Sequence, residues 1–293
     1  MANLGQPKNT IEILQKYQFR FQKKFGQNFL IDTHVLEKIV AAAEITKEDL
    51  VLEIGPGIGT LTQYLCEAAR EVVAVEIDRN LIPILEDTLS GYENVTILNE
   101  DILKLDLNRL VQEKNGGRPI KVVANLPYYI TTPIIMGLLE EHVPLVSITV
   151  MIQKEVAERM KAAPGSKDYG ALSLAVQYYA DTYLAAHVPP NCFMPRPGVG
   201  SAVIRLTKHE ACPVQVEDEA FLFRLIKASF AQRRKTLVNG LTNSPELELE
   251  KEAAAAALEQ MGLSPSVRGE MLSLEQFAEL AKRLGKENEK IYI

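Results

Sequence analysis

The fold is decided by the stretch Val51-Leu52-Glu53-Ile54-Gly55-Pro56-Gly57-Ile58-Gly59-Thr60-Leu61. It begins with apolar, β-branched residues typical of a buried strand, and alternate glycines then precede a new apolar run. Glycine reaches backbone angles that are closed to other residues and lets a ligand lie against the main chain. The stretch therefore predicts a strand that turns into a helix beside a small-molecule site, although a tight turn without a ligand would use the same glycines.

Short apolar runs of this kind recur along the chain, with helical stretches between them. They lie at residues 50–54, 71–77, 95–98, 120–124 and 146–152. This alternation, with strands that lack a polar face, is typical of a parallel sheet covered by helices on both sides. Two later runs, 183–188 and 202–206, are joined by a proline-rich segment and predict a hairpin at one sheet edge. We therefore predict an α/β fold with a Rossmann-like, doubly wound sheet.

The strand pattern stops after residue 206. Residues 208–218 have the composition of a linker, and the chain beyond them shows helical periodicity at 221–230, 247–261 and 274–284. We therefore predict two domains. Residues 1–208 form the α/β domain with a basic N-terminal arm, and residues 209–293 form a small all-helical domain.

Two predicted helices are preceded by residues whose side chains can cap free N–H groups. Asp32 stands before an apolar pattern that continues to Val40 at helical spacing. Ser273 and Gln276 match a capping box at the start of the last predicted helix. A helix is therefore expected to begin directly after Asp32 and after Ser273.

Length and composition describe an ordinary globular protein. The chain has 293 residues, of which 47% are hydrophobic and 24% charged, so it can bury a full core and still form a second domain. No apolar run approaches the ~20 residues that cross a bilayer. The start of the chain lacks the apolar core of a secretion signal. We expect a cytoplasmic protein that does not use the membrane.

Cysteine and histidine are few and scattered. The three cysteines form no Cys-x-x-Cys pair, and the four histidines lack the spacing of metal ligands. We therefore expect neither disulfides nor a structural metal.

Charge is distributed unevenly along the chain. The net charge of −6 argues by itself against a polyanionic partner, because nucleic-acid binding depends on neutralising phosphates. Residues 1–30 nevertheless carry five basic side chains against one acidic, and residues 220–245 carry five against none. These patches are either solvated surface or phosphate contacts. In the second case the candidate phosphate-binding residues are Lys23, Lys24, Arg233, Arg234 and Lys235.

Two acidic residues follow the next two predicted strands and narrow the choice of ligand. Glu76 lies 21 residues beyond Gly55, where a carboxylate can accept hydrogen bonds from ribose hydroxyls. Asp101 follows the third predicted strand and can accept from an adenine amino group. Because the three loops lie at the carboxyl ends of consecutive strands, they predict one nucleoside site at that sheet edge.

A nicotinamide dinucleotide is the main competing ligand. Its fingerprint has a glycine at the sixth position counted from Gly55, but Thr60 stands there. S-adenosylmethionine has no pyrophosphate to dock at such a turn. The pattern therefore favours S-adenosylmethionine, with Gly55, Gly57, Glu76 and Asp101 as candidate contacts.

The segment Asn125-Leu126-Pro127-Tyr128 follows the fourth predicted strand and carries the most specific chemistry. An adenine amino group is a poor nucleophile because its lone pair is delocalised into the ring. If the Asn125 side-chain oxygen and the Leu126 carbonyl accept hydrogen bonds from its two N–H groups, the nitrogen can pyramidalise toward a methyl donor. Pro127 would hold that carbonyl outward, and Tyr128 would offer a ring for stacking. An ordinary turn after a buried strand is the alternative.

These motifs make the chain similar, over nearly its whole length, to the ribosomal RNA adenine N6-dimethyltransferases, and most of all to those of the small subunit. The resemblance implies a class I methyltransferase sheet and S-adenosylmethionine as cofactor. The matched segments are Gly26-Gln27-Asn28-Phe29-Leu30, residues 53–59, 76–78, 100–101 and 125–128, Phe193-Met194-Pro195-Arg196-Pro197 with Val199 and Ser201, and Phe230-Ala231-Gln232-Arg233-Arg234-Lys235.

The resemblance also implies a substrate and further site residues. The family transfers two methyl groups to each of two adjacent adenines in a hairpin near the 3′ end of 16S ribosomal RNA, late in small-subunit assembly. By this resemblance Phe193 holds the target adenine opposite Tyr128, and the cofactor contacts are Asn28, Leu30, Gly55, Glu76, Asp101 and Asn125. A monomer acting on the small subunit or its precursor is expected.

Three other interpretations stay open at this point. A methyltransferase of the erythromycin-resistance type shares the motifs but acts on large-subunit RNA; the form of residues 26–30 and the helical tail favour the small-subunit family. A DNA adenine methyltransferase more typically has proline at the position of Leu126. A nonenzymatic assembly or transcription factor could keep the fold and the basic patches, although the intact set of Gly55, Glu76, Asp101 and Asn125 argues against it.

Overall fold

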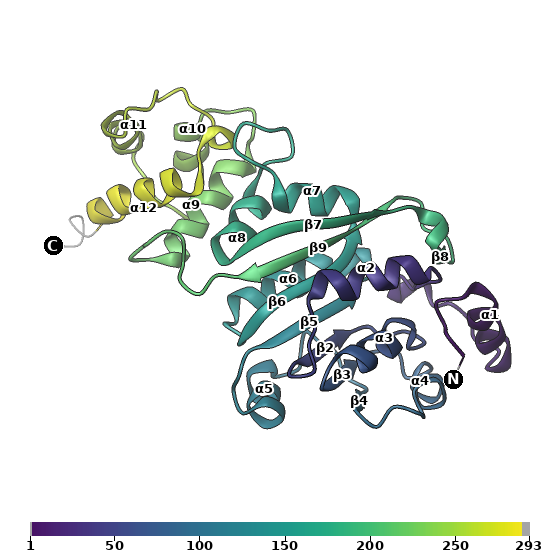
Figure 1. Cartoon of the computed structure of the whole chain (residues 1–293). Helices are drawn as coiled ribbons and strands as arrows, with labels where there is room; N and C mark the ends of the chain where they lie inside the picture. Colours follow the sequence, from purple (N-terminus) through teal and green to yellow (C-terminus); the bar gives the residue numbers. More distant parts are fainter. Residues whose placement is uncertain (1, 289–293) are drawn as a thin grey trace. The chain divides into compact units, whose positions relative to one another are not determined.

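The computed structural model describes residues 2–288 of the chain. It divides into two units, Met1–Ala157 with Thr182–Lys208 and Glu158–Asp181 with His209–Ile293. The first unit is α/β and the second is helical (Figure 1). Sequence patterns alone place Glu158–Asp181 in the first domain, whereas in the structure this segment packs within the helical unit.

Among the described residues, a seven-stranded sheet forms the centre of the first unit. Its strands are β2 (Leu50–Ile54), β3 (Glu71–Val75), β4 (Val95–Leu98), β5 (Ile120–Asn125), β6 (Leu145–Gln153), β7 (Ala180–Val188) and β9 (Ser201–Lys208). Their order across the sheet is β4-β3-β2-β5-β6-β9-β7. From β4 to β6 neighbouring strands are parallel, and β9 runs antiparallel to β6. Each of these strands overlaps a run that the sequence predicts, and the late pair closes one edge as expected.

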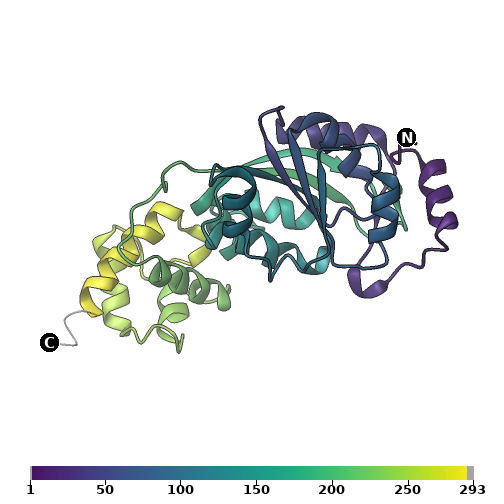
Figure 2. The ribbon, with the colours of Figure 1, turned by 90° about the horizontal axis from the view of Figure 1, so that it is seen from below.

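Helices cover both faces of this sheet, as Figure 2 shows. They are α2 (Thr33–Ala43), α3 (Thr60–Ala68), α4 (Ile82–Thr88), α5 (Leu107–Asn115) and α6 (Thr131–Glu140), while α7 (Lys154–Lys161) runs from the first unit into the second. Burial on both sides explains strands such as β5, whose residues Val122, Val123 and Ala124 are all fully buried. The Asp32 side chain accepts a hydrogen bond from the Val35 N–H group and caps α2, as predicted. The Rossmann-like α/β fold is confirmed.

The sheet brings the predicted site loops to one edge. Strand β2 lies between β3 and β5, and Ile54 at its end is in register with Val75 on one side and Ala124 on the other. The glycine turn after β2, Glu76 after β3 and Asn125 at the end of β5 are therefore neighbours. Because the order of the strands along the chain reverses between β2 and β5, this is the place where open α/β sheets bind ligands.

The N-terminal arm contains structure that sequence patterns did not predict. It forms helix α1 (Pro7–Lys16), a short 3-10 turn at Lys23–Phe25 and strand β1 (Phe29–Leu30). Strand β1 pairs with β8 (Phe193–Met194), in antiparallel register. The arm is thereby joined to the proline-rich loop between β7 and β9, and both segments reach the same end of the sheet.

The second unit is helical, as predicted. Its helices are α8 (Ala171–Tyr179), α9 (Glu219–Ala231), α10 (Leu237–Thr242), α11 (Lys251–Gln260) and α12 (Leu274–Asn288), with a 3-10 turn at Gly269–Met271. Helix α8 belongs here because the hydroxyls of Tyr178 and Tyr179 both donate to the Glu219 carboxylate at the start of α9. Helix α8 was not predicted from the sequence, which placed these residues in the first domain.

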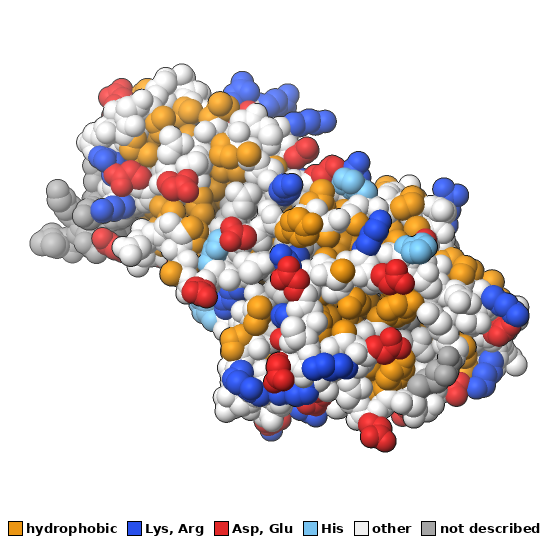
Figure 3. Space-filling view, in the orientation of Figure 1, with side chains coloured by type: hydrophobic (Ala, Val, Ile, Leu, Met, Phe, Trp, Pro, Cys, Tyr) orange, Lys and Arg blue, Asp and Glu red, His pale blue; other side chains and the backbone are white. Residues whose placement is uncertain are grey.

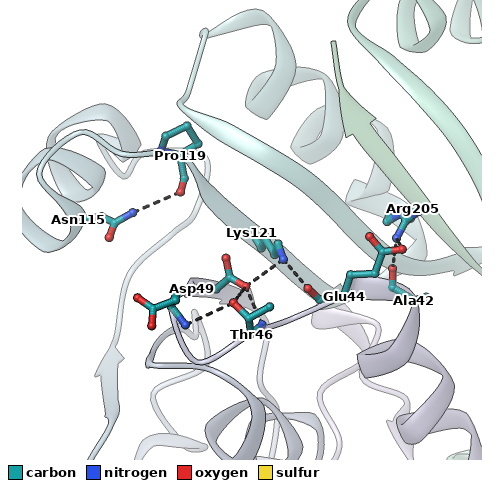
Figure 4. Close-up of polar contacts among 9 residues, drawn as sticks. Ala42, Glu44, Thr46, Asp49, Asn115, Pro119, Lys121 and Arg205 are labelled. Atoms are coloured by element: carbon teal, nitrogen blue, oxygen red, sulfur yellow. Dashed lines mark hydrogen bonds and ion pairs between the residues drawn. The ribbon is translucent and has the colours of Figure 1, made fainter. Parts of the chain in front are cut away.

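A network of polar side chains, of which Lys121 is buried and Glu44 exposed, lies at the amino end of the sheet, opposite the site (Figure 4). The Lys121 ammonium, near the start of β5, donates to the Asp49 carboxylate at 2.9 Å and to the Glu44 carbonyl. Arg205 of β9 pairs with the Glu44 carboxylate. Burial alone would raise the pKa of Asp49, but its hydrogen bonds, with that of Lys121 foremost, hold it below the ordinary value. The network ties the loop after α2 to strands β5 and β9.

Candidate active site

A pocket lies at the carboxyl ends of β2, β3, β4 and β5, in the first unit. It is lined by segments that are far apart in sequence, from the N-terminal arm to β8. The structure brings together all the cofactor and catalytic candidates of the sequence, which line this pocket: Asn28, Leu30, Gly55, Gly57, Glu76, Asp101, Asn125, Leu126, Pro127, Tyr128 and Phe193.

The turn after β2 requires glycine for its backbone shape. Gly55, Gly57 and Gly59 have φ values of +69°, +63° and +89°, in the left-handed region that other residues rarely adopt. A Cβ atom on Gly57 would also lie 3.0 Å from Cε1 of Phe29 in the arm. Alanine at Gly57 would therefore strain the turn and displace the ring that packs on it.

Glu76 is held between the glycine turn and the loop after β3. Its side chain is buried, and its two oxygens accept hydrogen bonds from the N–H groups of Gly57 at 3.1 Å and Asp78 at 2.8 Å. Burial raises the pKa of Glu76 to about 7, against the lowering effect of these bonds. Since a carboxylate can accept about four hydrogen bonds, Glu76 keeps acceptor capacity for two hydroxyl groups of a ligand.

Glu53 is a functional candidate that sequence reasoning quoted within the motif but did not select. Its side chain is 1% exposed and lines the pocket. Among residues 2–288 its Oε2 atom has no hydrogen-bond partner. Burial, with a smaller contribution from the nearby Glu76 charge, raises the pKa of Glu53 to about 8. An acid inside an apolar strand was the available signal, because a buried carboxylate without a partner is costly unless a ligand compensates it.

The loop after β4 adds an acceptor and an apolar wall. One Asp101 oxygen accepts from the Leu103 N–H group at 3.1 Å, and the side chain is 28% exposed. Ile77 and Ile102 line the same pocket, and 46% of Ile77 is exposed. An acceptor beside exposed aliphatic side chains fits a flat base with an amino group. Sequence reasoning selected the acid but not the isoleucines, because exposure of an apolar side chain depends on the fold.

The Asn125 loop is fixed by hydrogen bonds on both sides. The Asn125 side-chain nitrogen donates to the Asn28 carbonyl at 3.0 Å, so the amide oxygen is the end left to face away from the arm. The Leu126 N–H group donates to the Met151 carbonyl at 3.1 Å. The Pro127 carbonyl accepts from the Ile130 N–H group at 3.3 Å. This loop holds a side-chain acceptor in a set direction.

Two aromatic candidates stand at the same pocket. The Tyr128 hydroxyl lies 2.7 Å from the Ser201 Oγ atom, in hydrogen-bond contact. Phe193 is 4% exposed and belongs to strand β8, where its backbone pairs with Leu30. The resemblance assigns Phe193 to the target adenine, and the structure buries most of its side chain at the pocket. Tyr129, which the sequence did not single out, also lines the pocket and is 60% exposed.

The basic candidates of the helical unit differ in how free their charges are. Arg234 and Lys235 are exposed. The Arg233 guanidinium instead donates to the carbonyls of Lys167 at 3.0 Å and Tyr169 at 2.9 Å, and it pairs with Glu270 at 3.2 Å. Arg233 therefore uses its donors within the unit, and Arg234 and Lys235 are the better candidates for phosphate contact.

Two further basic candidates lie in the arm. Lys24 is exposed, with its ammonium 4.4 Å from the centre of the Phe25 ring, while the side chain of Lys23 lies outside the described part of the structure. On the face shown in Figure 3, Lys and Arg side chains are interspersed with acidic ones over the first unit and gather at the upper edge of the helical unit.

Within residues 2–288, no helix is both long enough and apolar enough to cross a bilayer. Nor does this part of the chain contain a group of three or more His, Cys, Asp or Glu side chains placed to hold a metal ion.

The residues of the pocket fit S-adenosylmethionine. Glu76 offers acceptors for ribose hydroxyls, Asp101 offers one for an adenine amino group, and the unpartnered Glu53 oxygen adds acceptor capacity deep in the site.

Two solved structures have the same fold. A dimethyladenosine transferase from Plasmodium falciparum aligns with a TM-score of 0.74 at 26% identity, over 89% of this chain and 98% of that one. The 23S rRNA methyltransferase ErmE aligns with a TM-score of 0.67 at 26% identity, over 88% and 99%.

Fold and site together define a class I, S-adenosylmethionine-dependent methyltransferase. The family model for ribosomal RNA adenine dimethylase matches residues 18–286, and the chain belongs to this family. It is 74% identical to a ribosomal RNA small subunit methyltransferase A from Lachnoclostridium phytofermentans, over 96% of this chain and 97% of that one. The protein of the same name from Alkaliphilus oremlandii is 52% identical over 98% and 99%.

Proposed function

We propose that the chain transfers methyl groups from S-adenosylmethionine to N6 of adenines in small-subunit ribosomal RNA. Family membership and full-length similarity to small subunit methyltransferase A proteins support this substrate. The single observation that carries the chemistry is the Asn125 amide, anchored through its nitrogen beside the glycine turn. The proposed targets are two adjacent adenines in a hairpin near the 3′ end of 16S RNA, each dimethylated late in subunit assembly.

Asn125 and Leu126 act on the nucleophile. The Asn125 oxygen and the Leu126 carbonyl accept hydrogen bonds from the two amino N–H groups of the adenine. These bonds draw the nitrogen out of conjugation with the ring. Since the loop is already fixed by its bonds to Asn28 and Met151, little ordering is needed when the base arrives. After transfer the methylated amino group carries one proton too many and loses it to solvent water, so a strong general base is not required.

The turn and the acids hold the cofactor. When bound, S-adenosylmethionine supplies an electrophilic methyl group on a positively charged sulfur. Glu76 accepts from the ribose hydroxyls, and Asp101 accepts from the adenine amino group. Asn28 and Leu30 bring the arm against the same ligand, and Glu53 offers an unpartnered oxygen at the buried end of the pocket. All of these groups are in place without rearrangement of the sheet.

Tyr128 and Phe193 grip the target base. An adenine in a hairpin must leave its stack before its amino group can enter a pocket, and a protein holds such a base by stacking. The Tyr128 ring is oriented by its hydroxyl contact with Ser201, and Phe193 is fixed by the pairing of β8 with β1. Arg234 and Lys235, with Lys23 and Lys24 of the arm, contact phosphates.

The proposed partner is the small ribosomal subunit or its precursor, and the chain acts on it as a cytoplasmic monomer. Large-subunit RNA, the substrate of the erythromycin-resistance type, is the less favoured alternative. The ErmE structure aligns less closely than the dimethyladenosine transferase, and the small-subunit name is carried by relatives up to 74% identical.

The test is the methylation of ribosomal subunits by the purified chain. Small and large subunits are isolated from a bacterial strain that lacks the small-subunit adenine dimethyltransferase and are incubated with the chain and labelled S-adenosylmethionine. Mass spectrometry of the digested RNA should find N6,N6-dimethyladenosine at two adjacent positions of the small-subunit RNA. Label in large-subunit RNA alone would favour the alternative, and no label in either RNA would contradict the proposal.

A further inference from the structure

Gln22, Gln27 and Asp78 have no role in the mechanism above, yet they form a closed set of hydrogen bonds. The Asp78 carboxylate is 2% exposed. It accepts from Gln22 Nε2, 3.1 Å from each of its oxygens, and from Gln27 Nε2 at 2.8 Å. Gln27 Oε1 in turn accepts from the main-chain N–H group of Gln22 at 2.9 Å. Because a buried carboxylate needs such donors, the arm is bound firmly at this point.

The backbone next to this cluster is linked to the catalytic amide by hydrogen bonds. Gly26, next to Gln27, adopts a φ of +58°, and its carbonyl accepts from the Asn28 side-chain nitrogen at 3.0 Å. The Asn28 carbonyl then accepts from the Asn125 side-chain nitrogen at 3.0 Å. The position of the Asn28 carbonyl therefore depends on where the two glutamines hold the arm.

We infer that Gln22 and Gln27, through Asp78, are positioning residues for methyl transfer. They keep the Asn28 carbonyl where it binds the nitrogen of the Asn125 amide and so turns the amide oxygen toward the substrate. Without this acceptor the amide is free to rotate and present its N–H groups, which repel the amino protons of adenine. The inference rests on the proposed function, since it concerns the orientation of Asn125 in that reaction.

The chain offers a matched control at the same carboxylate. Asn80 also donates to Asp78, from its side-chain nitrogen at 3.0 Å and from its main-chain N–H group at 3.1 Å. It belongs to the loop of Asp78 itself and not to the arm. Asn80→Ala therefore removes one neutral donor from Asp78 and leaves the arm attached.

The first measurement compares single-turnover methyl transfer at saturating RNA and cofactor. Gln27→Glu keeps the shape of the side chain but sets a carboxylate against Asp78, and its rate should fall about 10- to 100-fold, as when reactants are misaligned in other enzymes. Gln27→Met, which removes the donor without adding charge, should fall in the same range. RNA affinity should stay within about twofold for both, and Asn80→Ala should keep a rate within about twofold of the wild-type rate.

The second measurement is a rescue by reversal of the hydrogen bond. In Asp78→Asn with Gln27→Glu, the new amide at position 78 donates to the new carboxylate at position 27, whose other oxygen still accepts from the Gln22 N–H group. The remaining oxygen at position 78 still accepts from Gln22 and Asn80. The double variant should regain a rate within about threefold of wild type. Damage to folding alone would make the two effects add instead of cancel.

The outcomes separate this inference from the proposed function. The positioning role would be overturned by wild-type rates in Gln27→Glu and Gln27→Met, or by a double variant no faster than either single one. In both cases methyl transfer by the wild-type chain and its dependence on Asn125 would still stand. A wild-type chain that transfers no methyl group, or an Asn125→Ala variant with full activity, would overturn the proposed function and this inference with it.

Discussion

At the scale of single residues, the two buried carboxylates beside the glycine turn make stability depend on pH. Burial raises the pKa of Glu53 from its ordinary 4.5 to about 8. Between these values the folded chain binds more protons than the unfolded chain, so the free energy of unfolding decreases as pH rises through about 8. The melting temperature of the cofactor-free protein should therefore fall between about pH 5 and about pH 8 and level off at higher pH.

Glu53→Gln is the variant that checks this prediction. The amide cannot ionise, so the decline of melting temperature with pH should become shallower, leaving the smaller contribution of Glu76. Thermal unfolding followed by circular dichroism measures both slopes. A variant with the same slope as wild type would show that Glu53 does not set the pH response.

The three basic residues that follow α9 should differ in their effect on RNA binding. Arg234→Ala with Lys235→Ala should weaken RNA binding and reduce the slope of log affinity against log salt by about 1 for each phosphate that the variant no longer neutralises. Arg233→Ala should leave that slope unchanged and lower the melting temperature, because it frees the carbonyls of Lys167 and Tyr169. Binding titrations at several salt concentrations test this division, and a reduced slope in Arg233→Ala would refute it.

Most individual residues of the site could be predicted from the sequence. Gly55, Glu76, Asp101 and Asn125 could be placed because each follows a recognisable strand, and parallel strands bring their ends to one edge. The engagement of the Arg233 donors within the unit could not be foreseen, since its partners come from residues 167–169 and Glu270. Three consecutive basic residues look equivalent in a sequence, and only packing distinguishes them.

At the scale of elements, the Lys121 network should contribute strongly to stability. Lys121→Met leaves the Asp49 carboxylate and the Glu44 carbonyl without their donor in a mostly buried setting. Removing one partner of such a pair costs about 3–5 kcal/mol of unfolding free energy. Denaturant unfolding measures the decrease.

Lys114→Met serves as the matched control for that variant. Its ammonium pairs with Glu71 at 3.2 Å, but the lysine side chain is 37% exposed. An exposed pair contributes about 0–1 kcal/mol. Equal destabilisation in the two variants would mean that burial does not strengthen the Lys121 network.

Helix ends and strands that depend on residues close together in the sequence were predicted well. Ser273 and Gln276 form the capping box seen in the sequence, each side chain bonding the main-chain N–H group of the other. The strand pairing of β1 with β8 was not predictable, because two-residue strands have no periodicity and their partners are distant in sequence. Helix α1 lies in the segment that was described from the sequence only as a basic arm, and it was not predicted.

At the scale of the whole molecule, the segment Glu158–Asp181 links the stability of the helical unit to the middle of the chain. A chain cut after Lys208, the domain boundary that the sequence predicts, keeps α8 but lacks α9 to α12. Tyr169 is fully buried and donates to the Leu272 carbonyl at 2.8 Å, and Tyr178 and Tyr179 would lack Glu219. This truncated chain should melt at a lower temperature than the full chain or be insoluble. Unchanged melting would show that the segment does not depend on the helices after Lys208.

In the proposed reaction the Asn125 amide is the group that prepares the adenine nitrogen for attack. Its direct test is the single-turnover rate of Asn125→Ala on small subunits at saturating cofactor, with RNA affinity measured alongside. Methyl transfer should fall by about a thousandfold, as when a transition-state hydrogen-bond partner is removed, while RNA affinity stays near that of wild type. Transfer at the wild-type rate would contradict the account.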